Sequence, residues 1–216
     1  MNTIMVRILC VCLGYVFGLF QTAYIYGRTQ GIDIRKVGSG NAGTTNALRN
    51  FGTKVGILVL VCDMLKCILA VAVAKLIFGG SDLPARLIGI YAGAGAVLGH
   101  CFPFYMQFKG GKGIACLAGL LLSFSGVTFA LCMTFFFVIF FTTHYVSLGS
   151  LVGAAVFLIS TIIFGQSGSY GMSQAHLTEM YLVIACVVAL AFFLHRANIG
   201  RLLRGEERKT YLKKKK

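Results

Sequence analysis

Residues 55–78 read VGILVLVCDMLKCILAVAVAKLIF. A helix that crosses the hydrocarbon core of a bilayer needs about 20 predominantly apolar residues, and this stretch is long enough. Similar apolar runs lie at residues 4–26, 87–104, 114–125, 127–143, 146–164 and 180–194. The pattern predicts an all-α, polytopic integral membrane protein with about seven transmembrane helices. About five or six helices are the alternatives, because Gly126 is the one break between the fourth and fifth runs, which could form a single kinked helix.

The composition agrees with this class of protein. Hydrophobic residues make up 57% of the 216 residues and charged residues 12%, whereas about a quarter of a soluble domain is charged. The connections between the runs are short, so we expect a single membrane domain over residues 1–216. The first run is too long for a signal peptide and lacks a clear cleavage site, so it is interpreted as a mature span.

Positive charge is distributed unevenly along the chain. The net charge is +14, and Lys and Arg follow the first run, separate the third run from the fourth, and cluster after the last run, where residues 205–216 form a basic tail. This bias predicts a cytoplasmic C-terminus and, with an odd number of spans, an N-terminus outside. The tail is expected to contact anionic membrane lipids. The distribution argues against nucleic acid as a partner, and nothing indicates an obligate protein partner.

Charged residues inside apolar runs are costly. Asp63 and Lys66 can pair on one helical face, either to organise the helix or to contact a substrate. Lys75 and Arg86 are expected to extend to the outer interface. Close helix packing is expected where small residues recur, at Gly89, Gly93, Gly95 and Gly99.

Three polar, glycine-rich segments contain most of the candidate chemistry. The first polar segment is Gly38-Ser-Gly-Asn-Ala-Gly-Thr-Thr-Asn-Ala-Leu-Arg49. A glycine-rich turn that opens a helix presents backbone N–H groups to phosphate, and an arginine adds a bidentate contact. A polar turn without substrate contact is the alternative. The candidate residues are Ser39, Gly40, Asn41, Thr45, Asn46 and Arg49.

The second polar segment is Gly99-His-Cys-Phe-Pro-Phe-Tyr-Met-Gln-Phe-Lys-Gly-Gly-Lys-Gly113. Two lysines on either side of a Gly-Gly step offer cationic donors and a close approach of the backbone to a ligand. A simple connecting loop would need neither the glycines nor the histidine. The candidate residues are His100, Lys109, Gly110, Gly111 and Lys112.

The third polar segment is His195-Arg-Ala-Asn-Ile-Gly-Arg-Leu-Leu-Arg-Gly-Glu206. His195, Asn198 and Arg201 are spaced by three residues, which places them along about one face of a helix. His195 is a candidate proton carrier or donor to phosphate, and Glu206 is the candidate carboxylate. Because all three segments fall on the predicted cytoplasmic face, they predict a shared site for phosphorylated substrates.

Motifs of several other chemistries are absent from the sequence. It has no Walker-type nucleotide loop, GxSxG elbow, HExxH site or His-x4-Asp pair. Its eight cysteines lack CxxC or Cys/His spacing, so they are interpreted as small buried hydrophobes. No metal site and no cofactor are predicted.

Together the three polar segments closely resemble the signatures of the bacterial membrane acyl-phosphate:glycerol-3-phosphate acyltransferases. The family patterns SGNxGxTNxxR, GHxFPxxxxFKGGKGxA and HRxNIxRLxxGxE are similar to residues 39–49, 99–115 and 195–206, in order and at family-like spacing. Chain length and a seven-span topology also fit. The resemblance therefore covers essentially the whole chain.

The resemblance implies transfer of a fatty acyl group from acyl phosphate to the sn-1 hydroxyl of glycerol 3-phosphate, the first acylation of phospholipid biosynthesis. It implies a bacterial cytoplasmic (inner) membrane and an active site that faces the cytoplasm. The catalytic set it implies is Ser39, His100, His195 and Asn198. The substrate-binding set is Gly40, Asn41, Thr45, Asn46, Arg49, Lys109, Gly110, Gly111, Lys112, Arg201 and Glu206.

Two positions depart from the family pattern. Cys67 follows Asp63-Met-Leu-Lys66 where the family commonly has glycine, which bears on helix packing near Lys66. His144 precedes Tyr145-Val-Ser-Leu where the family commonly has arginine, which bears on a phosphate or headgroup contact.

We expect direct transfer without an acyl-enzyme, because acyl phosphate is already activated and the protein mainly supplies positioning and charge stabilisation. His195, His100 or a substrate phosphate would accept the hydroxyl proton. A transporter of an anionic metabolite and a lipid-binding scaffold are the rival interpretations. A transporter would usually show polar residues through the middle of the membrane and an internal repeat, and the sequence shows neither.

Overall fold

A computed structural model describes residues 2–211 of the chain. Within this range the structure is helical and contains no strand, so the predicted all-α class is confirmed. Short 3-10 turns lie at Ile34–Lys36 and Phe104–Met106. The α-helices are α1 (Thr3–Gly18), α2 (Thr22–Thr29), α3 (Thr44–Phe51), α4 (Thr53–Phe78), α5 (Ala85–Cys101), α6 (Ile114–Phe124), α7 (Gly126–Thr143), α8 (Val146–Gln166), α9 (Gln174–Leu194) and α10 (Arg196–Leu203).

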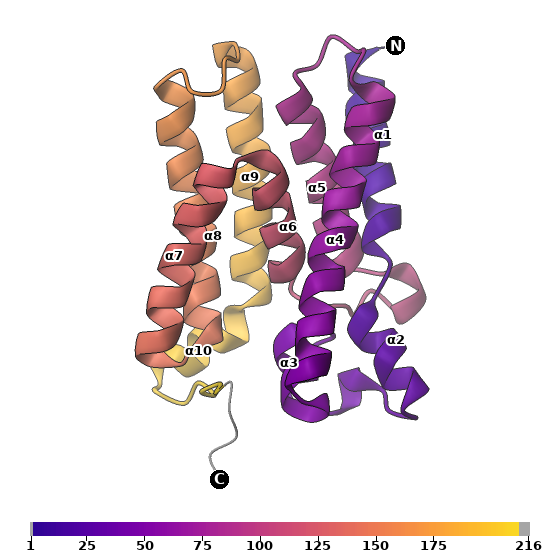
Figure 1. The fold of residues 1–216 in the computed structure, drawn as a ribbon, viewed down its shortest axis with the longest axis vertical. Helices are drawn as coiled ribbons and strands as arrows, with labels where there is room; N and C mark the ends of the chain where they lie inside the picture. Colours follow the sequence, from indigo (N-terminus) through magenta and orange to yellow (C-terminus); the bar gives the residue numbers. More distant parts are fainter. Residues whose placement is uncertain (1, 212–216) are drawn as a thin grey trace.

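The long helices form a bundle with two sides (Figure 1). Helices α1, α4 and α5 pack together on one side, α7, α8 and α9 lie on the other, and α6 lies between the two groups. Glycines allow the closest approach: a Cβ atom on Gly95 or Gly99 of α5 would collide with backbone oxygens of α1. The predicted close packing at these two glycines is confirmed.

Six segments of the described chain are long and apolar enough to cross a membrane. The first, Thr3–Thr29, is interrupted between α1 and α2. Gln21 is buried at this break, where its side-chain amide donates to the carbonyl oxygens of Gly18 at 3.2 Å and His100 at 3.0 Å. The continuous first span predicted from hydropathy is therefore two helices joined at a buried polar residue.

The predicted fourth span is shorter than a membrane crossing. It forms α6, whose 11 residues extend about 16 Å at 1.5 Å per residue, roughly half of a hydrocarbon core. Figure 1 shows that the α6–α7 turn stops short of the outer ends of α8 and α9. Of the predicted set of about seven spans, six segments have full length in the described chain and α6 does not.

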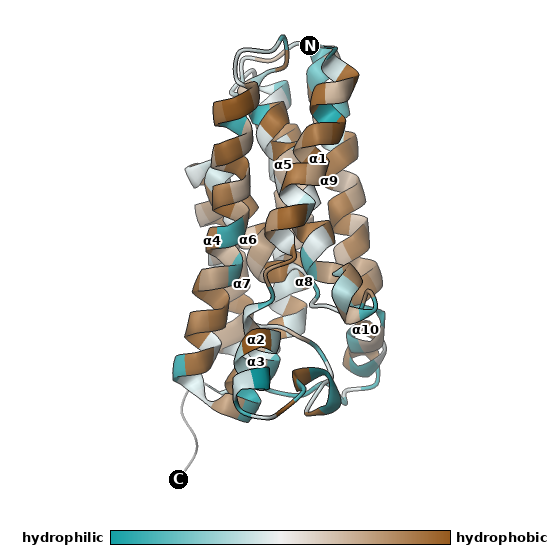
Figure 2. Ribbon diagram, turned by 90° about the vertical axis from the view of Figure 1, so that its right-hand side faces the viewer, coloured by the Kyte–Doolittle hydropathy of each residue, from teal (hydrophilic) through white to brown (hydrophobic). Residues whose placement is uncertain are grey.

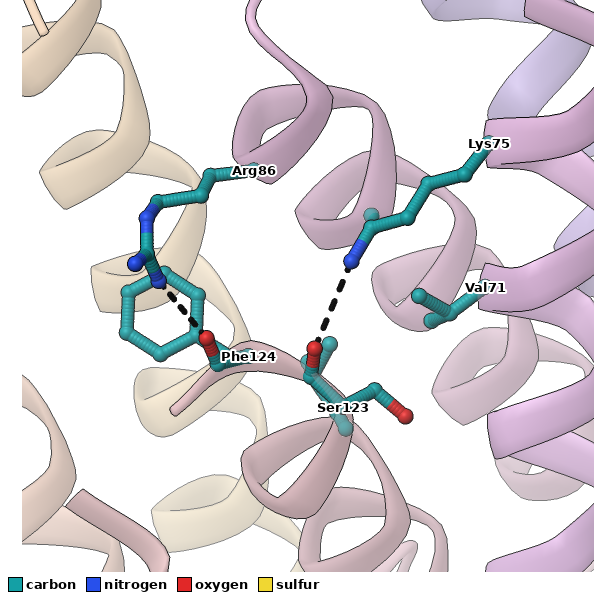
Figure 3. Close-up of a pocket in the computed structure, with 7 residues that line it drawn as sticks. Val71, Lys75, Arg86, Ser123 and Phe124 are labelled. Atoms are coloured by element: carbon teal, nitrogen blue, oxygen red, sulfur yellow. Dashed lines mark hydrogen bonds between the residues drawn. The ribbon is translucent and has the colours of Figure 1, made fainter. Parts of the chain in front are cut away.

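Two cations hold the carbonyl end of α6 inside the bundle (Figure 3). Lys75 Nζ donates to the Ser123 carbonyl at 3.4 Å, and Arg86 Nη1 donates to the Phe124 carbonyl at 2.8 Å. The Arg86 guanidinium also lies 4.9 Å from the ring centre of Tyr170. A helix C-terminus has unpaired carbonyls and a partial negative charge, which these cations stabilise. The predicted extension of Lys75 and Arg86 to the outer interface is thus replaced by a contact with α6.

Polar residues gather at one end of the bundle. Helices α2, α3 and α10 lie at the end opposite to the start of α1, and hydrophilic residues concentrate there (Figure 2). Residues 205–211 of the predicted basic tail run along this end. The predicted lysine run at residues 213–216 lies outside the described residues.

Candidate active site

The second and third polar segments meet at the Asn198 side chain. Lys112 donates a hydrogen bond to Asn198 Oδ1, and Asn198 Nδ2 donates to Glu207 Oε1 at 2.7 Å. Glu207 Oε1 also accepts from Ser147 Oγ at 3.0 Å, and its Oε2 accepts from Arg201 Nε at 2.7 Å. We call these five residues the polar cluster. Lys112 precedes α6, Ser147 lies on α8, Asn198 and Arg201 lie on α10, and Glu207 follows α10.

Glu207, rather than the predicted Glu206, is the carboxylate of the polar cluster. The Glu206 side chain is 60% exposed and pairs with Arg204 at 2.8 Å, whereas the Glu207 side chain is 5% exposed. Counted from His195, the last position of the pattern HRxNIxRLxxGxE falls on Glu207. The match to residues 195–206 therefore ends one residue too early.

The charges of the polar cluster favour an anionic ligand. Burial lowers the pKa of Lys112 to about 8, and the positive charge of Arg201 adds to this shift. Burial would raise the pKa of Glu207, but hydrogen bonds from Arg201, Asn198 and Ser147 outweigh it and lower that pKa. Near neutral pH the cluster therefore holds two cations and one carboxylate, an excess of positive charge that attracts phosphate.

His195 lies next to the polar cluster, at the junction of α9 and α10. Its side chain is buried, and Nδ1 is 2.7 Å from the Ala191 carbonyl oxygen. A carbonyl can only accept, so Nδ1 carries the proton and Nε2 is left as an acceptor. Burial and the positive charge of Lys112 lower the pKa of His195 to about 4. The imidazole is therefore neutral at physiological pH, with the Nε2 lone pair as its acceptor site.

The first polar segment joins the site through Arg49. Arg49 Nη2 donates to Thr210 Oγ1 at 2.6 Å and to the Arg208 carbonyl at 3.0 Å. Thr210 N donates in turn to the His144 carbonyl at 2.9 Å. Residues 207–210 thus form a strap between α3, α7 and α10. Arg49 is close enough for its charge to lower the pKa of Lys112, so all three polar segments contribute cations to one region.

Asn46 shapes the turn of the first polar segment. It is buried, and its Nδ2 donates to the carbonyls of Ile34 and Val37, both at 3.1 Å. Its Oδ1 accepts from the backbone N–H of Ser39 at 2.9 Å. Asn46 therefore holds the loop together, and its role in substrate binding stays a prediction. The other candidates of this turn are exposed (Ser39, Gly40) or half-buried (Asn41, Thr45).

The turn opens α3 at Gly43, as the sequence predicted for a glycine-rich turn. Thr44, the first residue of α3, has a buried Oγ1 with no hydrogen-bond partner within residues 2–211. The first backbone N–H groups of a helix are also free to bind an anion. The opening of α3 therefore offers donors beside Arg49, on the same short helix.

The second polar segment divides into supporting and exposed residues. His100 is buried, and its ring lies against Gly111, where a Cβ atom would collide with it. Gly110 N and Gly111 N each donate to an α5 carbonyl at 3.1 Å, so both glycines fasten the loop to the end of α5. Lys109 is exposed, whereas Lys112 reaches the polar cluster through its hydrogen bond to Asn198.

The sequence matches a family model described as glycerol-3-phosphate acyltransferase over residues 8–205. The chain belongs to this acyltransferase family. Glycerol-3-phosphate acyltransferase 2 of Bacillus cereus is 38% identical over 205 residues, which cover 94% of each chain. A glycerol-3-phosphate acyltransferase of a Thermoanaerobacter species is 35% identical over 206 residues, covering 95% of this chain and 96% of the relative.

Solved structures of the family share the fold of this acyltransferase. The crystal structure of PlsY, an integral membrane glycerol 3-phosphate acyltransferase, in its glycerol 3-phosphate form is 31% identical with a TM-score of 0.81. Its lysophosphatidic acid form is 30% identical with a TM-score of 0.78, and both cover 95% of this chain and 96% of that chain. With its long apolar helices, this acyltransferase is a multi-pass integral membrane protein.

The two departures from the family pattern have different settings in this acyltransferase. Cys67 is fully buried in the main hydrophobic core. His144 ends α7 with a φ of 61°, and its ring lies 4.6 Å from the ring of Tyr211. Its carbonyl accepts from Thr210, so the position of the family's arginine supports the strap here.

Several residues of the site were not predicted for this acyltransferase. Ser147 lies in the Tyr145-Val-Ser-Leu stretch, of which only the preceding His144 departs from the family pattern. Thr44 lies within the first pattern at a position that the pattern leaves variable. Glu207 was recoverable by counting the third pattern to its end. Thr210 lies beyond every pattern, and its role depends on the path of the strap, which no local signal reveals.

Proposed function

We propose that this protein transfers a fatty acyl group from acyl phosphate to the sn-1 hydroxyl of glycerol 3-phosphate. The products are 1-acylglycerol 3-phosphate and inorganic phosphate, in the first acylation step of phospholipid biosynthesis. The convergence of Arg49, Lys112 and Arg201, one from each polar segment, carries this proposal. It occurs in a chain whose family match spans residues 8–205.

Both substrates carry a phosphate group, and the site offers two adjoining sets of donors. One set is the opening of α3, with its backbone N–H groups, the Thr44 hydroxyl and Arg49. The other set is Lys112 and Arg201 of the polar cluster. Their present acceptors are a carboxamide, a carboxylate and strap oxygens. A phosphate forms stronger charge-assisted hydrogen bonds than the neutral carboxamide and strap oxygens and would replace them. Arg201 keeps Glu207 on its Nε and offers phosphate its other guanidinium N–H groups.

The chemistry proceeds by direct transfer. The sn-1 oxygen attacks the acyl carbonyl carbon, the bond from that carbon to the phosphate oxygen breaks, and phosphate leaves with the electron pair. The hydroxyl proton passes to Nε2 of His195, the histidine nitrogen that the Ala191 contact leaves as an acceptor. His100 does not suit this role, because Lys66 occupies its Nδ1 and Gly111 covers its ring.

His195→Gln tests this assignment. It removes the basic nitrogen while keeping a polar side chain, so kcat should fall about 100-fold with KM changed little. The measurement is steady-state kinetics of the purified variant. Near-normal turnover would exclude a histidine base and leave a substrate phosphate in that role.

The polar end of the bundle is proposed to face the cytoplasm in a bacterial inner membrane, with the N-terminus outside. Lys and Arg are concentrated around α2, α3 and α10, in keeping with the positive-inside rule. Helix α6 starts at the polar end and α7 returns to it, so the α6–α7 hairpin adds no net crossing. The number of crossings therefore stays odd. The acyl donor then enters from the lipid and glycerol 3-phosphate from the cytoplasm, with no obligate protein partner.

Turnover with different acyl donors tests the proposed donor. Purified protein in detergent is given labelled glycerol 3-phosphate with palmitoyl phosphate, palmitoyl-CoA or palmitoyl-acyl carrier protein. We expect labelled lysophosphatidate with palmitoyl phosphate alone, together with an equal amount of inorganic phosphate. Equal turnover with palmitoyl-CoA would contradict the assignment of the donor.

A further inference from the structure

A buried charge network lies beneath the second polar segment, at the depth of the spans. The Lys66 ammonium of α4 forms an ion pair with Asp63 Oδ1 at 2.9 Å. It also donates to the Phe20 carbonyl at 2.6 Å and contacts His100 Nδ1 at 2.8 Å. The Lys66, Asp63 and His100 side chains are 4%, 1% and 3% exposed. One ammonium therefore joins α4, the break after α1 and the end of α5.

Lys66 depends on these partners because it borders lipid-facing surface. An apolar groove of about 400 Å³ between α1 and α4 is lined by residues such as Phe17, Leu65 and Lys66 itself. Charged groups at this depth are costly unless protein groups solvate them. The Lys66 ammonium is therefore solvated by three protein groups, and His100 is one of them.

The contact with Lys66 determines the proton arrangement of His100. An ammonium can donate but not accept, so His100 Nδ1 is the acceptor and the ring proton lies on Nε2. The Nε2 edge of the same ring faces Gly111, with no room for a Cβ atom on that residue. His100 is therefore held on one edge by Lys66 and rests on the other against Gly111, in the glycine loop of residues 110–113.

The glycine loop leads directly to the polar cluster. The Gly111 N–H donates to the His100 carbonyl at 3.1 Å, and the same oxygen accepts from Gln21 Nε2 at 3.0 Å. Lys112 is the next residue, and its ammonium binds Asn198. The position of Lys112 is thus connected to Lys66 through a single histidine and a single glycine.

We propose that Lys66, together with Asp63, is a positioning residue for the acyltransferase reaction. It fixes the tautomer and ring position of His100, which supports Gly111 and thereby places Lys112 for phosphate binding. This inference rests on the proposed function, in that Lys112 is taken to bind a substrate phosphate. A purely structural role of the ion pair in the bundle is the competing explanation.

Removal of the pair as a whole provides the first test. Lys66→Met alone would leave Asp63 as a buried unpaired charge, so Asp63→Asn is combined with it. We expect the KM for glycerol 3-phosphate or for acyl phosphate to rise about tenfold while kcat stays within about threefold. As a matched control, Arg7→Met with Glu179→Gln removes the ion pair between α1 and α9, which lies apart from the loop. Its KM values should stay within about twofold.

A double-mutant cycle separates positioning from general stability. If Lys66 acts through Lys112, the Asp63→Asn/Lys66→Met change should raise KM no further in a Lys112→Met background. A full tenfold rise of KM in the Lys112→Met background would overturn the proposal. It would also be overturned if the Asp63→Asn/Lys66→Met change left KM unchanged when Lys112 is present, or if the Arg7/Glu179 control showed an equal rise.

The tautomer of His100 can be measured without any variant at the ion pair. The ¹⁵N shifts of protein labelled at histidine, assigned with His100→Asn, should show His100 neutral with its proton on Nε2. A proton on Nδ1 would contradict the arrangement. This measurement needs no turnover, so it distinguishes failure of the inference from failure of the proposed function, which a wild type without acyltransferase activity would show.

Discussion

At the scale of residues, the Asn198 carboxamide divides the polar cluster into a cationic and an anionic side. Its oxygen accepts from Lys112 and its nitrogen donates to Glu207. Glu207 in turn fixes Arg201 through its second oxygen at 2.7 Å. The carboxylate therefore orients Asn198 and Arg201, two side chains of the proposed phosphate-binding region.

Replacement of Glu207 by Gln should lower kcat/KM by about tenfold, because the charge that holds Arg201 and Asn198 is lost. The neighbouring Glu206→Gln is the matched control, since Glu206 is exposed and pairs with Arg204. It should stay within about twofold of wild type. Steady-state kinetics measure both variants, and equal effects of the two would show that Glu207 does not orient the cluster.

The pKa of Lys112 gives the site a pH dependence. Burial lowers this pKa to about 8, so the ammonium is present below that pH and is lost as the pH rises through it. We expect kcat/KM, which reports the free enzyme, to fall above about pH 8. In Lys112→Arg the fall should move to higher pH, because a guanidinium stays charged. Identical profiles for the two proteins between pH 7 and 10, roughly the range in which a lysine titrates, would rule out Lys112 as the titrating group.

Residue types and spacing in the sequence were enough to locate the site, but not every role within it. Arg49, Lys112, His195 and Asn198 come together at the polar end, where the patterns predicted a shared site. Asn46 has the same chemistry as Asn198, yet its amide is used within its own loop. Burial and partners, which distinguish the two, depend on tertiary packing.

At the scale of elements, α6 links the interior of the bundle to the site. Its first turn follows Lys112 and Gly113, and its last carbonyls bind Lys75 and Arg86 (Figure 3). Both ends of this half-length helix are therefore fixed by groups outside it. Lys112 directly precedes this helix, so the contacts at the far end of α6 also help to fix the position of Lys112.

Loss of either capping cation should destabilise α6. Lys75→Met or Arg86→Met leaves a carbonyl without its donor, at a cost of about 1–2 kcal/mol each. A loss of this size lowers the midpoint of thermal unfolding by roughly 2–8 °C. Lys54→Met, on the exposed start of α4, is the control and should leave the midpoint unchanged. Thermal unfolding in detergent measures all three, and an unchanged midpoint for both cap variants would refute the capping role.

Hydropathy could predict the long helices because a membrane span requires a long apolar run. It could not show that the predicted span 114–125 is the half-length helix Ile114–Phe124, since an apolar helix inside a bundle has the same composition. The break at Gln21 was also hidden, because its carbonyl partners come from α5 and from the end of α1.

At the scale of the whole molecule, the strap joins the two sides of the bundle at the polar end. Arg49 on α3 binds it from one side, and His144 at the end of α7 binds it from the other. The long helices carry the apolar surface, and the polar end carries the donors (Figure 2). The site therefore lies where both groups of helices meet at one face.

The proposed orientation predicts which end a protease can reach. A cleavable tag after residue 216 should be cut in inverted membrane vesicles and protected in right-side-out ones. A tag before residue 1 should show the opposite pattern. Cleavage of both tags from the same side would contradict an odd number of crossings.

The most direct test of the central claim is the product formed from labelled glycerol 3-phosphate and palmitoyl phosphate by purified protein in lipid nanodiscs. The account predicts labelled 1-acylglycerol 3-phosphate in the wild type, and a loss of about 100-fold in Asn198→Ala. Absence of lysophosphatidate from the wild type, together with uptake of the labelled anion by proteoliposomes, would contradict the account and identify a transporter.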